Sequence, residues 1–422
     1  MKIGIIAVGS QGDVQPYAAL GAGLTRRGHR VTLISHESFR PLAASCALDF
    51  APVAGNPMEI VQGAEGQSWL ASSGRSVSFL LRLSRLARGI IDQLAHDALS
   101  GGRGSDLIVY SLPLSIAGYT VAESLGVPGL PAALYPLHPT ASFPSIMSPN
   151  LPLRFPLVNR ASAAMVAKLY WSVIGPLQRR WREHELELAP LSRRNPFASF
   201  LGKGTPFLYG YSPSVIPRPS DWDDHLAVCG YWFLDHQEGW KAPQGLREFI
   251  EAGPPPFYIG FGSMASGDPK ATAGIVLEAL ARSGQRAVLA AGWGGLHADD
   301  LPDTVFPVGF VPHGWLFPRM GGIIHHGGAG TTATALRAGV PQAVVPFFAD
   351  QFFWGKRIAE LGLGPRPLAK RHLAVEPLAD RMRLLVGDRE NARRSAAMAA
   401  AIAAEDGIGK AVSVVERYMA GC

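Results

Sequence analysis

The sequence predicts an α/β protein with two doubly wound parallel-sheet domains in series. Three observations lead to this prediction. Short apolar runs alternate with stretches of helical spacing over residues 1–140, the pattern becomes irregular over residues 209–256, and the alternation then restarts. Strands that alternate with helices form a parallel sheet with helices on both faces. A chain of 422 residues is long enough for two or three such domains.

The first domain begins with residues 2–8, KIGIIAV, a continuous apolar run typical of a buried parallel strand. Residues 10–13 turn the chain, and residues 14–28 have helical spacing that stops at a glycine. Further strands are expected at 30–35, 106–111 and 127–134, with a helix at 115–126. Residues 140–200 are rich in Pro, Phe, Trp and Arg and predict longer helices.

The second domain restarts with a strand in residues 256–264, PFYIGFGSM. The elements expected after it are a helix at 271–284, strands at 286–292 and 321–326, a helix at 333–339 and a strand at 342–347. We place the domains at 1–235 and 236–422, with the last helix able to pack back on the first domain. Two such domains are expected to face a central cleft that binds the ligand at the carboxyl ends of the strands.

Composition excludes several classes of protein. The net charge of +6 comes from scattered basic residues, which argues against nucleic-acid binding. Three distant cysteines, Cys46, Cys229 and Cys422, argue against a disulfide framework and indicate a reducing compartment. No signal-peptide pattern and no run of 18 apolar residues is present, so a cytoplasmic location is expected.

The glycine-rich stretch HHGGAGTT, residues 325–332, predicts a strand-to-helix turn that binds a diphosphate. Glycines let the backbone approach a ligand, and the amides and positive dipole end of the following helix attract anions. His326 and the threonines add side-chain donors. Without a lysine after the glycines this is not a P-loop, and it lacks GxGxxG. The alternative is a glycine-rich connector with structural histidines.

Fixed dipoles and His326 can stabilise a leaving diphosphate without a metal ion, so none is expected. The histidine pair lacks a third ligand at suitable spacing for zinc. Two companion segments follow strands of the same domain. Ser263 in GFGSM can donate to the same phosphates, and Asp350 with Gln351 can accept from adjacent sugar hydroxyls. Helix capping is the alternative role for Asp350.

Residues 308–364, VGFVPH through HHGGAGTT and ADQFFW, strongly resemble the donor-binding signature of family 1 glycosyltransferases. The branch they are most similar to holds sterol 3-beta-glucosyltransferases and antibiotic glycosyltransferases. Residues 9–33, GSQGDVQPYAALGAGLTRRGHRVTL, resemble the first strand, loop and helix of that branch. The resemblance implies the GT-B fold, with the acceptor in the N-terminal half and the nucleotide sugar in the C-terminal half.

The resemblance also implies roles for single residues. Phe310 takes the position that stacks on the nucleobase, and His313 the position at the base edge. The diphosphate would be contacted by His326, Gly328, Gly330 and Thr331, and the sugar by Asp350 and Gln351. Where plant-type members have a glutamate that holds the ribose, this chain has Thr334. UDP-sugar and dTDP-sugar donors therefore both remain open.

Inverting glycosyl transfer needs a base for the acceptor hydroxyl, and Asp13 is the candidate. It follows the first strand, and the resemblance places it where many members carry the histidine of QGHxxP and this branch carries Asp. A free Asp, with a pKa near 3.9, is a weak base, which partial burial would strengthen. The alternative is that Asp13 only caps the helix beginning at Val14.

The acceptor is expected to be a lipophilic alcohol such as a sterol, triterpenoid or polyketide, and the sugar a hexose, first of all glucose. Residues 78–91 and 154–175 are amphipathic and fit an apolar acceptor pocket or a peripheral membrane contact; ordinary core-facing helices are the alternative. His138 is a weaker candidate for lining the acceptor site.

Three alternative functions remain. One is an antibiotic or macrolide-type transferase that uses a dTDP-deoxysugar. The second is a sugar-nucleotide epimerase on the same scaffold, and the third a non-catalytic partner subunit that retains the fold. Incubation with a UDP-sugar alone separates the epimerase from a transferase.

Overall fold

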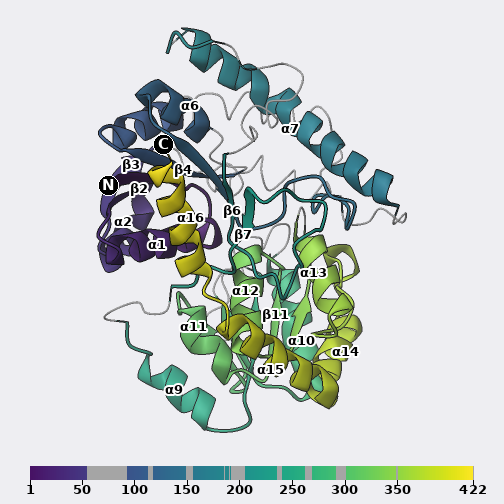
Figure 1. The fold of residues 1–422 in the computed structure, drawn as a ribbon. Coiled ribbons are helices and arrows are strands. Elements are labelled where there is room, and N and C mark those ends of the chain that lie inside the picture. Colours follow the sequence, from purple (N-terminus) through teal and green to yellow (C-terminus); the bar gives the residue numbers. More distant parts are fainter. Residues whose placement is uncertain are drawn as a thin grey trace. The chain divides into compact units, whose positions relative to one another are not determined.

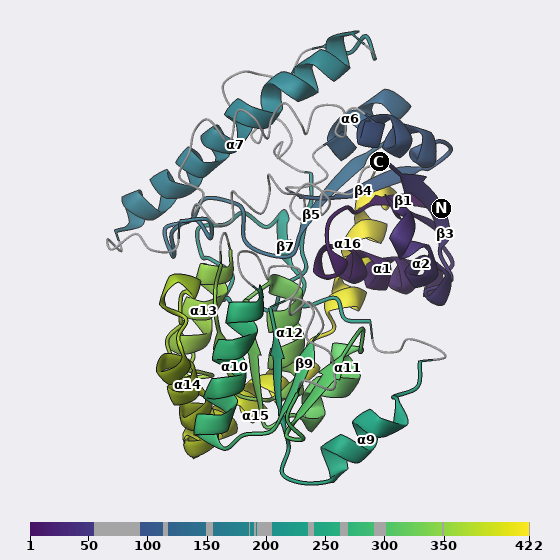
Figure 2. The same cartoon turned by 180° about the vertical axis from the view of Figure 1, so that it is seen from behind.

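The computed structural model describes residues 1–54, 93–112, 117–148, 155–184, 186–189, 191, 205–234, 240–261, 269–290, 301–347 and 350–421 (Figures 1 and 2). These residues form two compact units. Unit 1 runs to Leu234 and includes the last segment of the chain from Glu405, and unit 2 lies between them and ends at Ala404. Among the described residues, the chain therefore passes from unit 1 to unit 2 and then returns to unit 1.

Unit 1 is built on a parallel sheet with the strand order β3-β2-β1-β4-β5-β6-β7. The strands are β1 (Lys2–Ile6), β2 (Arg30–His36), β3 (Asp49–Val53), β4 (Leu107–Ser111), β5 (Gly129–Ala133), β6 (Phe207–Tyr209) and β7 (Leu226–Val228). The order reverses between β1 and β4, which pair in register from Ile3 with Leu107 to Ile6 with Tyr110. In a doubly wound sheet the loops after two such strands diverge and leave room for a ligand.

Helices cover both faces of this sheet. They are α1 (Gln11–Arg26), α2 (Arg40–Ser45), α6 (Ala117–Leu125), α7 (Pro156–His184) and α16 (Gly407–Ala420). Alternate strand residues such as Ile3, Ile5 and Val109 form one buried cluster with α1 and α16. The intervening residues point the other way, where Gly118 of α6 lies directly against the Tyr110 ring.

Unit 2 is also built on a parallel sheet, with the strand order β10-β9-β8-β11-β12. Its strands are β8 (Phe257–Gly260), β9 (Ala287–Ala290), β10 (Val305–Val308), β11 (Gly322–His325) and β12 (Gln342–Val344). Its helices are α9 (Gln244–Glu251), α10 (Pro269–Ser283), α11 (His313–Leu316), α12 (Ala329–Ala338), α13 (Gln351–Glu360), α14 (Val375–Gly387) and α15 (Arg389–Ala403). Here the order reverses between β8 and β11.

The two faces of this second sheet bury separate clusters. Phe257, Ile259 and Ile324 pack with α10 and α14 on one face. Tyr258 and Ile323 pack with α11 and α12 on the other. This alternation is the pleat of a strand that is buried on both sides, and it explains why these strands read as continuous apolar runs.

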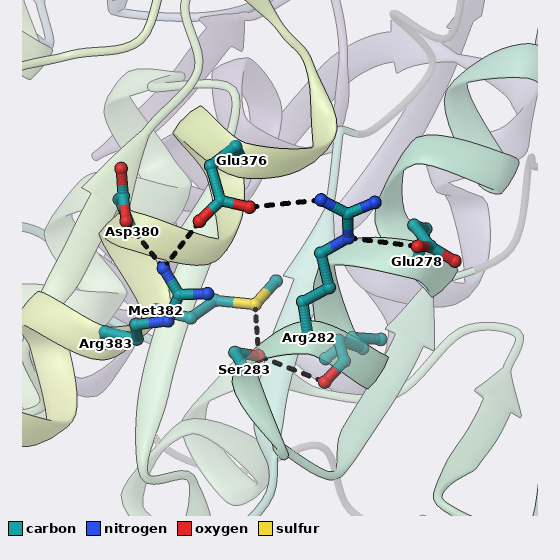
Figure 3. Close-up of polar contacts among 8 residues, drawn as sticks. Glu278, Arg282, Ser283, Glu376, Asp380, Met382 and Arg383 are labelled. Carbon is teal, nitrogen blue, oxygen red and sulfur yellow. Dashed lines mark hydrogen bonds and ion pairs between the residues drawn. The ribbon is translucent and has the colours of Figure 1, made fainter.

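Helices α10 and α14 are also joined at their solvent edge (Figure 3). Arg282 reaches Glu278 on its own helix at 3.0 Å and Glu376 on α14 at 3.3 Å. Arg383 bonds with the same Glu376 at 2.9 Å. All these side chains are about half exposed, so the apolar contact between the helices, and not the ion pairs, supplies most of their stabilisation.

The prediction of two parallel α/β domains is confirmed, but two helix starts are wrong. The first helix begins at Gln11 and not at Val14, because Ser10 is its N-cap and Asp13 its third residue. Helix α12 begins at Ala329 and not at residue 333, so only His326, Gly327 and Gly328 remain as the turn. The expected irregular stretch also contains β7 and α9. None of the helices in the described residues is both long and apolar enough to cross a membrane.

Candidate active site

The loop after β1 positions Asp13 at the point where the strand order of unit 1 reverses. The backbone N–H and the hydroxyl of Ser10 both donate to Asp13 Oδ2, at 2.8 and 2.7 Å. Gly9 has a φ of +129°, and a Cβ there would come within 2.7 Å of the same oxygen. The described residues give Oδ1 no hydrogen bond. One oxygen is therefore fixed by the helix start and the other is left to interact with a ligand.

The surroundings of Asp13 favour its protonated form. Burial raises the pKa of this carboxyl, and the two hydrogen bonds from Ser10 oppose that effect only in part. A cavity of about 10 Å³ beside it is lined by Asp13, Tyr17, Ser111 and Tyr135, among others. A cavity of this size holds about one water molecule. Among the described residues it is thus the immediate environment of the carboxylate.

Tyr17 fixes the next turn of α1 to the sheet. Its hydroxyl donates to the Ala132 carbonyl at 2.9 Å, and its ring meets Trp232 edge-on at 5.5 Å. Burial, and then the charge of Asp13, raise the pKa of Tyr17 well above its usual value. Tyr17 therefore stays neutral and holds α1 in place, so that Asp13 is presented from a rigid helix.

His138 lies in an aromatic cluster and is not among the residues that line the cavity beside Asp13. Its Nδ1 bonds with the Tyr209 hydroxyl, and its ring is edge-on to Phe207 at 4.8 Å and to Trp222 at 5.9 Å. Burial lowers the pKa of His138 to about 3. The described contacts are those of a packed core histidine, and its acceptor-binding role stays a prediction.

In unit 2, the HHGG turn is shaped by His325, the last residue of β11. Its Nδ1 accepts from the Gly327 N–H at 3.1 Å, so Nε2 carries the hydrogen and donates to Gln342 Oε1 at 2.8 Å. Burial lowers the pKa of His325 to about 3. The turn also needs Gly327, whose φ is +91° and whose Cβ would meet Val344 and the backbone of Gln351. The first histidine of the pair is therefore structural.

The second histidine, His326, lies over the start of α12. A Cβ on Gly328, the N-cap of that helix, would come within 2.5 Å of His326 Nε2. The Nδ1 atom is buried and has no hydrogen-bond partner among the described residues. Burial lowers the pKa of His326 to about 4, against the opposing effect of a backbone hydrogen bond with Gly260. A neutral imidazole thus stands beside the free amides of a helix N-terminus, an arrangement suited to a phosphate group.

Gly330 and Thr331 lie in the first turn of α12, where backbone N–H groups have no carbonyl partner within the helix. Thr332, which follows them, is buried, and its hydroxyl has no hydrogen-bond partner in the part of the chain that the structure describes. Thr334 donates its hydroxyl to the Gly330 carbonyl at 2.9 Å. The residues predicted to contact the diphosphate therefore lie together at the start of α12. Thr334 is instead bonded to the backbone of its own helix.

His313 begins α11 and is held by aromatic neighbours. Its Nε2 bonds with the Tyr258 hydroxyl at 3.1 Å, and its ring stacks on Phe317 at 4.3 Å. Burial, and then the neighbouring His326, lower the pKa of His313 to about 4. Phe310, three residues earlier, is 64% exposed, whereas the other aromatic side chains described in unit 2 are buried or half-buried. An exposed ring of this kind is available for stacking.

Asp350 and Gln351 lie at the start of α13. Asp350 is the N-cap, but its carboxylate makes no capping hydrogen bond and accepts from Trp354 Nε1 at 3.2 Å. Gln351 is buried and accepts from the Phe347 N–H at 2.8 Å. Because the Gln351 backbone touches Gly327, this helix start lies against the HHGG turn. Their sugar-binding roles stay predictions.

Ser263 and residues 78–91 lie outside the described residues. Within the described part, no cluster of three His, Cys, Asp or Glu side chains could hold a metal ion. Two features of the site were not predicted: the hydrogen bonds from Ser10 to Asp13 and the contact of His325 with Gln342. The spacing Ser-x-x-Asp before an apolar helix was the available signal for Ser10.

Two family models match the chain. Residues 3–144 match the glycosyltransferase family 28 N-terminal domain, and residues 276–416 match the erythromycin biosynthesis protein CIII-like C-terminal domain. Among solved structures, glycosyltransferase VinC in complex with dTDP shares the fold, with a TM-score of 0.62 at 20% identity over 99% of this chain and 100% of that one.

Curated relatives match over almost the whole chain. The sterol 3-beta-glucosyltransferase UGT80B1 of Arabidopsis thaliana is 37% identical over 99% of this chain and 68% of its own length. The sterol 3-beta-glucosyltransferase of Aspergillus fumigatus is 35% identical over 99% of this chain, which spans only 30% of that longer protein. The chain therefore belongs to the glycosyltransferase family that includes the sterol 3-beta-glucosyltransferases.

Proposed function

We propose that this chain transfers a hexose, glucose in the first place, from a nucleotide diphosphate sugar to a hydroxyl of a lipophilic acceptor of the sterol class. The transfer inverts the configuration at the sugar C1, and Asp13 is the general base. The observation that carries the donor half is the neutral His326 ring beside the N-terminus of α12. The raised pKa of the half-buried Asp13 supports the acceptor half.

The donor half would be the work of unit 2. The amides at the start of α12 and a ring N–H of His326 would stabilise negative charge on the departing diphosphate. Because His326 is uncharged, the site would supply directed dipoles and no fixed positive charge. Phe310 and His313 would contact the nucleobase, and Asp350 with Gln351 the sugar. No metal ion is part of the proposal.

The acceptor half would be the work of Asp13. As the acceptor oxygen forms its bond to C1, the bond between C1 and the phosphate oxygen breaks, and the diphosphate leaves with the electron pair. The hydroxyl proton passes to Asp13, for which Oδ1 is available, while Ser10 continues to hold Oδ2. A carboxylate with a raised pKa takes this proton more readily than a solvated one.

The identity of the acceptor is inferred from the relatives. Both curated relatives described above are sterol 3-beta-glucosyltransferases, and they favour transfer over the epimerase alternative. Their longer chains leave the acceptor of this chain to experiment. A sterol with a free 3-hydroxyl is the first acceptor to test. We further propose that the enzyme acts in the cytoplasm, at or near a membrane surface.

A dTDP-sugar is the second candidate donor. The structure of VinC holds dTDP, and Thr334 occupies the position where a ribose-binding glutamate is expected from the resemblance. Because its hydroxyl is already bonded to the Gly330 carbonyl, Thr334 is a poor ribose ligand. Comparing the rise in melting temperature with UDP and with dTDP decides which nucleotide is bound.

The test of the function is a panel of donors and acceptors with mass detection. UDP-glucose and dTDP-glucose are each combined with sterols, triterpenoids and polyketide alcohols. A glucosylated sterol with the β-linkage supports the proposal. Retention of configuration, epimerised nucleotide sugar, or no product with any acceptor contradicts it.

A further inference from the structure

Tyr258 is a buried tyrosine of β8 to which the proposed reaction gives no role. Its ring packs against Phe317 with the ring centres 4.9 Å apart. Its hydroxyl reaches His313 Nε2 at 3.1 Å, and the His313 ring stacks on the same Phe317 at 4.3 Å. A Cβ at Gly260 would collide with the Tyr258 hydroxyl, so glycine at the end of β8 leaves room for this group. The contact between the two rings is therefore fixed by their neighbours in unit 2.

The direction of the hydrogen bond between Tyr258 and His313 follows from burial. Burial raises the pKa of the Tyr258 hydroxyl, so this group keeps its hydrogen at neutral pH. His313 is the one hydrogen-bond partner that the described residues give it. If the histidine donated, the buried hydroxyl hydrogen would have no acceptor, at the full cost of removing it from water. Tyr258 therefore donates, and His313 Nε2 accepts.

This hydrogen bond also fixes the place of the single ring hydrogen on His313. Burial lowers the pKa of His313 to about 4, so the ring is neutral at pH 7 and carries one hydrogen. Since Nε2 accepts from Tyr258, that hydrogen lies on Nδ1. Nδ1 has no hydrogen-bond partner among the described residues, and the His313 side chain is half-buried. The ring therefore presents an N–H donor to a ligand.

We propose that Tyr258 is a positioning residue that holds His313 as a hydrogen-bond donor, so that the site selects a nucleobase with a carbonyl oxygen at its edge. Uracil and thymine both offer that oxygen, whereas cytosine has an amino group, itself a donor, at the same place. Two donors that face each other leave both unpaired, which disfavours a cytidine nucleotide.

The inference rests on the proposed function, in which His313 contacts the nucleobase. It adds the residue that acts through His313 and the class of base that the site takes. UDP and dTDP are not distinguished by this contact, because both of their bases carry the oxygen. Both candidate donors therefore satisfy it.

The first measurement is the position of the ring hydrogen of His313 in the full chain without ligand. Nuclear magnetic resonance of histidine labelled with a heavy nitrogen isotope distinguishes a protonated ring nitrogen from an unprotonated one, and His313→Gln identifies the signal. Nδ1 should be protonated in the native chain. In Tyr258→Phe the ring should also populate the form with the hydrogen on Nε2, because the hydroxyl donor is gone. A native ring with its hydrogen on Nε2 overturns the proposal.

The second measurement is calorimetric titration with UDP and with CDP. The native chain should bind UDP about tenfold or more tightly than CDP. Tyr258→Phe should reduce that ratio about threefold to tenfold, because Nδ1 of the released ring can then accept from the amino group. The matched control is Tyr110→Phe, which removes the hydroxyl of a buried tyrosine on β4 of unit 1 and should keep the native ratio. An equal loss of affinity for both nucleotides in Tyr258→Phe overturns the proposal, since a merely structural role weakens them alike.

The double variant Tyr258→Phe/His313→Gln shows whether Tyr258 acts through His313. Added to His313→Gln, the change at Tyr258 should leave the ratio of UDP to CDP affinity as it is, because the ring that Tyr258 positions is absent. A further change in the ratio contradicts the proposal. Melting temperatures check that every variant folds.

Failure of this inference is distinguishable from failure of the proposed function. A native chain that binds none of UDP, dTDP and CDP refutes the nucleotide-sugar donor. If the native chain transfers sugar from a UDP-sugar, and Tyr258→Phe discriminates against CDP as the native chain does, the role of Tyr258 alone is refuted.

Discussion

The carboxylate of Glu405 accepts a hydrogen bond from the Ser212 hydroxyl at 2.7 Å, across 193 residues of sequence. The Ser214 hydroxyl donates to the same oxygen at 2.8 Å, while Glu405 Oε2 is buried and the described residues give it no hydrogen-bond partner. Beside them, Gly230 has a φ of +110° and Gly407 packs against its backbone. These contacts hold the returning chain to unit 1, just before α16 enters the core.

Glu405→Ala should therefore destabilise unit 1. The buried Ser212 hydroxyl loses its acceptor, which costs about 1–3 kcal/mol for a group removed from water, while the exposed Ser214 hydroxyl can bond with water instead. Urea unfolding followed by tryptophan fluorescence measures the change. Glu278→Ala is the matched control, because that carboxylate forms an exposed pair with Arg282 (Figure 3) and should matter far less. Equal losses in the two variants would show that the Glu405 contacts do not hold α16.

Asp13→Asn should lower kcat/KM for transfer by about 10²–10⁴-fold, the usual contribution of a general base. The amide oxygen can still accept from Ser10, so the fold should persist. Nucleotide binding should be unchanged, because the residues proposed to bind the nucleotide lie in unit 2. The control is Asp388→Asn, a helix-capping aspartate of α15 that accepts from the Asn391 N–H. Activity within a few-fold of the native enzyme in Asp13→Asn would leave Asp13 only its capping role.

The pH profile of kcat/KM should show an acid limb that comes from the titration of Asp13. Its pKa is raised above 3.8 by burial, and only the ionised form accepts a proton. Activity should therefore fall as the pH drops through a value above 3.8, and this acid limb should be lost in the residual activity of Asp13→Asn. An acid limb that is the same in both proteins would assign it to another group.

Gly328→Ala should weaken nucleotide binding about tenfold or more, because a Cβ there displaces the His326 ring from the start of α12. Gly274→Ala on α10 is the control, since a Cβ at Gly274 has no atom within 4 Å. Calorimetric titration with UDP and with dTDP measures both variants. If Gly328→Ala binds the nucleotide with native affinity, the diphosphate does not bind at the start of α12.

The stability of unit 2 should fall as the pH drops below neutral. Burial depresses the pKa values of His313 and His326 to about 4 and of His325 to about 3, against 6.5 for a free histidine. The unfolded chain therefore binds more protons. Stability is complete above pH 6.5 and is lost by about 1.4 kcal/mol per histidine for each pH unit below it, until the folded pKa is reached. Thermal unfolding between about pH 7 and pH 5 shows this slope, and a flat profile contradicts it.

The strands that carry the site could be predicted because burial on both faces makes them continuous apolar runs. Three of these strands lie within the predicted runs: Lys2–Ile6, Phe257–Gly260 and Gly322–His325. The edge strands Asp49–Val53 and Leu226–Val228 were missed, since both are partly exposed and the second has only 3 residues. Their residues become strands because a neighbouring strand offers them hydrogen-bond partners, which local sequence does not reveal.

The candidate site was predictable as residue types but not as contacts. The glycines and histidines of the turn indicated an anion site, and the structure brings them to one helix end. Which histidine is structural could not be foreseen, because it depends on His325 reaching Gln342 on the neighbouring strand. In the same way, the hydrogen bond from the Ser10 hydroxyl to Asp13 can be placed only once the helix is known to start at Gln11.

The return of the chain at Glu405 has a consequence for recombination among relatives. A hybrid made by joining two enzymes at one point near Leu234 would give the first unit a foreign α16, whose Ala411, Val412 and Val415 must fit its core. Exchanging unit 2 without changing the core of unit 1 needs two junctions, the second between Ala404 and Glu405, so that unit 1 keeps its own α16.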